Sequence, residues 1–157
     1  MYEPKTIEQW IYATLSADTT LQTLLSPDNL PAGYQLGIYA HVAPQVDPRS
    51  NREPQTPYVV FSRYGGDVDS TALNGDRVMA NPAYNVVIWD TQSGAVSASR
   101  AQDIADRVDS LLGDKDVTTT TPPIYCQRIN SDILIQPSQG GRVDVGVVLQ
   151  YRFVAFV

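Results

Sequence analysis

The amino-acid sequence predicts an α+β fold, in which helices pack on a largely antiparallel β-sheet. Three observations lead to this prediction. Apolar residues recur with helical spacing in two segments, near residues 6–16 and 94–112. Alternation of apolar and other residues marks the last sixteen residues as one long strand. Glycine and proline clusters separate further strand-like segments, so we expect a single domain, 1–157, with the order α-(α)-β-β-β-α-β-β and a long C-terminal hairpin.

The N-terminal segment is expected to be helical. One face of a helix over residues 6–16 carries Ile7, Trp10, Ile11 and Leu15. Asp18 is placed to cap a second short helical turn that contains Leu21, Leu24 and Leu25. Residues 37–42 are typical of a short strand. Residues 43–56 contain three prolines and many polar residues, which predicts an exposed loop.

The middle of the chain predicts a hairpin followed by a helix. Strands are expected over residues 57–64 and 77–91, joined by a glycine-bearing hairpin loop over 65–77. Pro82 inside the second strand indicates an edge position or a bulge, because proline cannot donate to a sheet. We expect Ser93 to cap the helix that follows and Gly113 to occupy the C′ position at its end.

The C-terminal part predicts a second hairpin that extends beyond its own subunit. A polar connection over 114–121 leads to a strand over 124–136, a turn over 137–141 and the closing strand over 142–157. Sixteen extended residues span roughly 50 Å, whereas a compact domain of this size is about 40 Å across. The odd-numbered face is apolar throughout, and the even-numbered face becomes apolar at its end. We therefore expect subunit contacts at Val148, Tyr151, Val154 and Phe156.

Composition limits the classes of function. The formal charge is −6, from 11 basic and 17 acidic residues, which argues against a broad nucleic-acid-binding surface. The single cysteine excludes an intrachain disulfide and fits a reducing compartment. No signal peptide or membrane-spanning stretch is recognised, so we expect a soluble protein made in the cytoplasm, with no membrane contact.

Residues that could carry chemistry do not form a known constellation. His41 and Cys126 are the only residues of their kinds, but nothing in the sequence brings them together, and an inert buried thiol is the expected role of Cys126. Asp67, Asp69 and Asp76 lie in one loop, but the glycine and glutamate of a calcium loop are absent there. No phosphate-binding glycine loop is present. We expect no cofactor, no metal and no enzymatic activity.

Seven segments, taken in order, resemble one protein family. They are "LSADTTLQTLL" after the first helix, "GIYAHVAPQ", "PYVVFSRYGGD", "YNVVIWD", "SRAQDIADRVDSLL" and "LQYRFVAF", together with the N-terminal helix itself. The set resembles the tail-completion (tail terminator) proteins of long-tailed bacteriophages. Residues 46–55 look like an insertion relative to that pattern, and the connection over 114–121 is longer.

The resemblance implies a structural role in the virion. Such proteins form a ring, commonly a hexamer, which caps the tail tube, ends its polymerisation and docks to the head–tail connector proteins. Genomic DNA would then pass through the ring without specific binding. Because negative charges repel the DNA backbone, we expect Asp67, Asp69 and Asp76 to line the channel or its rim. Two alternatives remain: another neck protein (head-closure or connector-adapter), and a cytosolic domain that dimerises and binds a small molecule.

Overall fold

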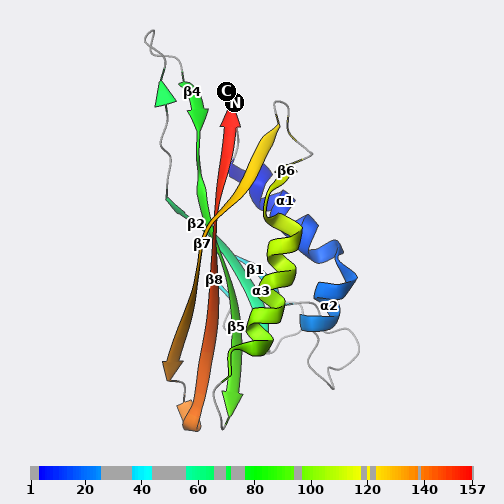
Figure 1. Cartoon of the computed structure of the whole chain (residues 1–157), viewed down its shortest axis with the longest axis vertical. Coiled ribbons are helices and arrows are strands. Elements are labelled where there is room, and N and C mark those ends of the chain that lie inside the picture. The colour runs from blue at the N-terminus through cyan, green and yellow to red at the C-terminus, as the bar shows by residue number, and fades with distance from the viewer. Residues whose placement is uncertain are drawn as a thin grey trace.

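The protein is an α+β domain with one helical layer against one curved sheet (Figure 1). The computed structural model describes residues 4–25, 37–43, 56–65, 70–71, 77–93, 97–117, 120, 123–137 and 139–156. The helices are α1 (Pro4–Ala17), α2 (Thr19–Leu25) and α3 (Ser99–Leu112). The strands are β1 (Ile38–Ala40), β2 (Tyr58–Gly65), β3 (Ser70–Thr71), β4 (Arg77–Ala80), β5 (Ala83–Ser93), β6 (Lys115–Val117), β7 (Ile124–Pro137) and β8 (Arg142–Phe156). The predicted fold class and the order of the main elements are confirmed.

Strand β8 is the centre of the sheet. It pairs along one side with β5 and, beyond it, with β4, and along the other side with β7. Strand β2 follows β5, and β1 forms the edge beyond β2. All of these pairs are antiparallel except β1 with β2. The predicted C-terminal hairpin is therefore confirmed as the β7–β8 pair.

The helices cover one face of the sheet and bury the core there. In Figure 1, α1, α2 and α3 all lie on the same side of the strands. The odd-numbered residues Val145, Val147, Leu149, Tyr151 and Phe153 of β8 point to this side and are buried, as the alternation predicts. Aromatic rings of Trp10 and Tyr84 both meet Phe153 edge to face, with ring centroids 6.0 and 5.4 Å away. This joins α1 to the centre of the sheet.

The predicted helix ends are confirmed at Asp18, whereas the structure differs from the prediction at Ser93 and at Gly113. Asp18 caps α2, because its Oδ1 accepts a hydrogen bond of 2.7 Å from the backbone N–H of Leu21. The prediction that Ser93 caps α3 is wrong, since Ser93 is the last residue of β5. Gly113 follows α3 but has an extended backbone, and Asp114 adopts the positive φ of 55° instead. A Cβ on Gly113 would lie 2.8 Å from the carbonyl oxygen of Asp109, so close approach explains this glycine.

The strand expected over 77–91 is interrupted at Pro82. The register continues across the break, because Ala80 lies opposite Ala155 and Ala83 lies opposite Arg152. The carbonyl of Pro82 accepts a 2.9 Å hydrogen bond from the N–H of Phe153, but proline has no N–H to return. Pro82 therefore separates β4 from β5 within one continuous line of strand beside β8, and it does not mark an edge strand.

Two short strands lie where only loops were expected. Strand β3 lies inside the segment 65–77, which was expected to be a loop. It pairs with β4 and so extends the sheet beyond β4. Strand β6 pairs with residues 124–126 of β7 inside the segment 114–121. Residues 44–55 of the expected loop over 43–56 lie outside the described residues.

Candidate assembly surface

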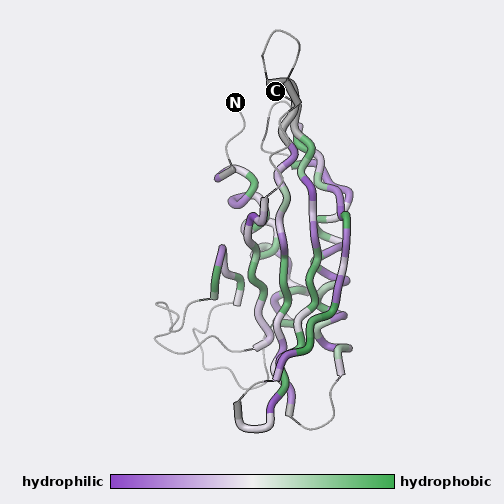
Figure 2. Tube along the Cα trace, turned by 90° about the vertical axis from the view of Figure 1, so that its left-hand side faces the viewer, coloured by the Kyte–Doolittle hydropathy of each residue, from purple (hydrophilic) through white to green (hydrophobic). Residues whose placement is uncertain are grey.

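One face of the sheet is not covered by any of the described helices, α1, α2 and α3. Figure 2 looks onto this face, with the strands in front of the helices. Cross-strand neighbours on it include Val60, Val87 and Val148, which lie side by side on β2, β5 and β8 and are half-buried. Val154 lies further along β8 on the same face. A row of valines on an uncovered sheet is an apolar surface that a partner could cover.

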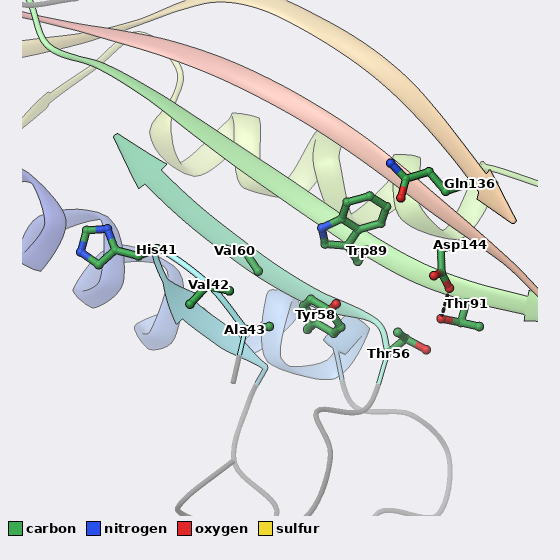
Figure 3. A pocket seen from close by; sticks show the side chains of 10 residues that line it. All are labelled: His41, Val42, Ala43, Thr56, Tyr58, Val60, Trp89, Thr91, Gln136 and Asp144. Atoms are coloured by element: carbon green, nitrogen blue, oxygen red, sulfur yellow. Dashed lines mark hydrogen bonds between the residues drawn. The ribbon is translucent and has the colours of Figure 1, made fainter. Parts of the chain in front are cut away.

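A hollow of about 440 Å³ opens at one end of this face (Figure 3). Tyr58, Val60 and Trp89 form its apolar part. Its polar part includes Asp144, whose Oδ1 accepts a 2.7 Å hydrogen bond from the Thr91 hydroxyl. Burial, and secondarily the charge of Asp144, raises the pKa of Tyr58. The hollow therefore combines aromatic surface with one carboxylate.

The indole of Trp89 packs directly over the glycine opposite it on β8. Trp89 and Gly146 are direct cross-strand partners on β5 and β8. A Cβ added to Gly146 would lie 2.9 Å from Cζ3 of the indole, so the ring occupies the space that any larger residue would need. This explains why a glycine interrupts the valines of β8.

Strand β7 carries a second apolar surface. Ile133 and Ile135 lie opposite Val147 and Val145, so they point to the helical side of the sheet. Unlike those buried valines, Ile133 is 48% exposed and Ile135 is 60% exposed. In Figure 1 the end of β7 swings to the left, away from α1, α2 and α3, so none of the described helices covers this part of the strand.

A bulge decides which residues of β7 face the helices. Cys126 and Arg128 face them before the bulge, opposite Phe153 and Tyr151, and the register then shifts between Arg128 and Asn130. After the extra residue the odd-numbered side chains face the helices. Sequence alternation does not reveal an inserted residue, so the sequence alone does not indicate which face of the sheet Ile133 and Ile135 occupy.

An ion pair joins β7 to α3 just before the bulge. Nη1 of Arg128 is 2.9 Å from Oδ2 of Asp109, and the hydroxyl of Tyr151 donates a 3.0 Å hydrogen bond to Oδ1 of the same carboxylate. Burial, followed by the Asp109 charge, raises the pKa of Tyr151. This cluster of Arg128, Tyr151 and Asp109 ties the first part of β7 and the centre of β8 to α3.

The four predicted interface residues fall in different places. Val148 and Val154 are half-buried on the uncovered face. Tyr151 lies in the core of the subunit with no exposed surface, so it is not available for contact with another chain. Phe156 is the last residue of β8 and pairs with Met79, and its side chain lies outside the described residues. Asp67, Asp69 and Asp76 lie outside them as well.

His41 and Cys126 are far apart. The Nε2 of His41 is 3.5 Å from a carboxylate oxygen of Glu8 on α1, at the β1 edge. Cys126 on β7 is fully buried, and β2, β5 and β8 lie between the two strands, a separation of about 19 Å at ordinary strand spacing. Burial raises the pKa of the Cys126 thiol far above its ordinary value. Within the described residues, no group of three or more His, Cys, Asp and Glu is placed to hold a metal ion.

Comparison with known proteins shows a likeness to a solved virion structure. No protein-family model and no curated protein matches the chain. Among solved structures, the chain is similar to one from the virion of a native gene transfer agent (GTA) particle, with a TM-score of 0.53 and 18% sequence identity. The alignment covers 92% of this chain and 92% of that chain. The two chains therefore share a fold across almost their whole length.

In the described part of the chain, no helix has both the length and the apolar character to cross a membrane.

Proposed function

We propose that this chain is a non-enzymatic structural protein of a phage-like virion, and that it forms a ring at the end of the tail tube. The observation that carries the proposal is the fold shared with a chain of the gene transfer agent virion over 92% of both chains. The sequence resemblance to tail terminators supports the finer role. In that role the ring ends tube polymerisation and joins the tail to the head connector.

The placement of the apolar surfaces supports assembly into a ring. The exposed isoleucines of β7 face the helical side, whereas Val60, Val87 and Val148 face the opposite side. Two different surfaces on opposite sides of a subunit favour head-to-tail contacts, which close into a ring when the rotation between subunits allows it. Six subunits would carry a formal charge of −36, six times −6. That charge favours passage of DNA without retention.

The acidic residues Asp67, Asp69 and Asp76 remain candidates for the channel or its rim. The strands that flank them, β3 and β4, lie at the same end of the sheet as the C-terminus of β8. Replacing all three with Lys should leave assembly intact and make the rings retain DNA at low salt, because a basic lining binds phosphates.

The decisive experiment is to mix the purified protein with assembled tail tubes of the same phage and with its head connector, separately. A tail terminator binds one end of each tube in electron micrographs and stops further addition of tube protein. Binding to the connector with no effect on tube growth would instead support a head-closure or connector-adapter protein. Failure to bind either would refute both forms of the proposal.

A further inference from the structure

Beyond residue 126, β7 is an edge strand in the described part of the sheet. Strand β6 pairs only with residues 124–126, so residues 127–137 have β8 on one side and no described strand on the other. An edge of this length with exposed isoleucines is a template on which another chain could add a strand. Whether another strand can add to β7 therefore depends on the N–H and C=O groups that point away from β8.

The hydrogen-bond pattern identifies those groups. The N–H of Phe153 donates to the carbonyl of Pro82, so the backbone of Phe153 points toward the β4–β5 side of β8. Backbone direction alternates along an antiparallel strand, so even-numbered residues of β8 point toward β7. Their partners on β7 after the bulge are 130, 132, 134 and 136. The residues between them, Ser131, Ile133 and Ile135, consequently direct their N–H and C=O groups to the open edge.

Two of these outward amides already have acceptors within the strand. Oδ1 of Asn130 accepts a 2.9 Å hydrogen bond from the N–H of Ser131. Oδ1 of Asp132 accepts a 2.8 Å hydrogen bond from the N–H of Ile133. Pro137 has no N–H to offer. Between 131 and 137, Ile135 is thus the outward residue whose amide has no such side-chain acceptor.

We propose that Asn130 and Asp132 cap this edge and prevent strand addition by a second copy of the chain. An incoming strand would have to displace both caps before it could bond to Ser131 and Ile133. It would also bring its own backbone against the Asp132 carboxylate, which offers no donor to that strand's carbonyl groups. The free hairpin therefore associates through side chains such as those of Ile133 and Ile135, and does not continue the sheet. This inference rests on the edge geometry and does not depend on the ring.

The test compares three double variants of the full chain. Asn130→Leu with Asp132→Leu removes both acceptors at nearly unchanged side-chain shape. Asn130→Asp with Asp132→Asn keeps both acceptors and the net charge. Gln127→Leu with Gln136→Leu adds the same two leucines to β7 and leaves the caps in place. All four positions are exposed, so each variant is expected to fold.

The readouts are the mass in solution as a function of concentration and hydrogen exchange at the amides of Ser131 and Ile133. Only the variant without caps should grow with concentration, to roughly twice the wild-type mass or more, with slower exchange at both amides in the assembled form. The proposal is overturned if that variant keeps the wild-type mass, or if the Gln127 and Gln136 control assembles equally. The proposal is also overturned if assembly of the wild-type protein slows exchange at both amides. Such slowing would show that the edge of β7 pairs with another strand in the wild-type assembly.

Discussion

Replacing Gly146 with Ala should destabilise the protein through Trp89. The new methyl carbon would lie 2.9, 3.1 and 3.2 Å from three ring carbons, whereas ordinary contacts begin at 3.4 Å. The indole must therefore move by about 0.5 Å, and overpacking of this kind costs about 1–3 kcal/mol. The hollow beside Trp89 gives the indole room to move, which favours the lower half of that range.

The opposing effect of the substitution is smaller. Gly146 does not have a positive φ, so alanine fits its backbone and restricts the unfolded chain, a gain of about 0.4–1 kcal/mol. The net expectation is a loss of about 1 kcal/mol in the free energy of unfolding. Urea unfolding followed by circular dichroism measures it, at one fixed protein concentration because assembly shifts apparent stability.

A double-mutant cycle assigns the loss to the indole. In a Trp89→Leu background the methyl group introduced by Gly146→Ala no longer meets the indole, so the same substitution should become neutral or stabilising. The coupling free energy should then be about 1 kcal/mol or more. Equal costs in the two backgrounds would refute the contact between Gly146 and Trp89.

Three further outcomes are expected. Ile133→Ser with Ile135→Ser should reduce the mass of the assembled protein and leave the unfolding midpoint of the subunit nearly unchanged, because both side chains are about half exposed; unchanged assembly would exclude them from an interface. A thiol reagent should modify Cys126 only on unfolding, and Cys126→Ser should cost about 1–3 kcal/mol by burying an unpaired hydroxyl; rapid labelling of the folded protein would contradict the burial. Hydrogen bonds from Arg107 lower the pKa of Asp18 below 3.8, so their stabilisation is complete above that pH and is lost as the pH falls through the lower folded pKa. Asp18→Asn keeps an N-cap acceptor and should lose this part of the acid dependence, and an identical acid dependence in the variant would contradict it.

The sequence predicts those elements whose pattern is local. The stripe of α1, the cap at Asp18 and the alternation of β8 all depend on neighbours within a few residues, and all three are confirmed. Strand β6 is different, because three residues form a strand only when β7 provides the partner. Ser93 resembled a helix cap, but pairing with Arg142 keeps it in β5. Long-range pairing decides both cases.

The candidate site was predicted only in part, for similar reasons. Val148 and Val154 are candidates because of their place on the even-numbered face of β8, which none of the described helices covers, and their role as contacts stays a prediction. Tyr151 belongs to the odd-numbered face, whose alternation already indicated the core. Ile133 and Ile135 depend on the bulge between Arg128 and Asn130, which has no glycine or proline to mark it in the sequence.

The mass of the purified full chain in solution tests the central claim most directly. Light scattering combined with electron microscopy should find a closed ring as the dominant species, near 103 kDa if six copies of the 17.2 kDa chain assemble. The ring should persist on dilution to the low micromolar range, because it closes on itself and leaves no free subunit contacts. A monomer of 17.2 kDa or a dimer of about 34 kDa at every concentration, or an open filament, would contradict the account.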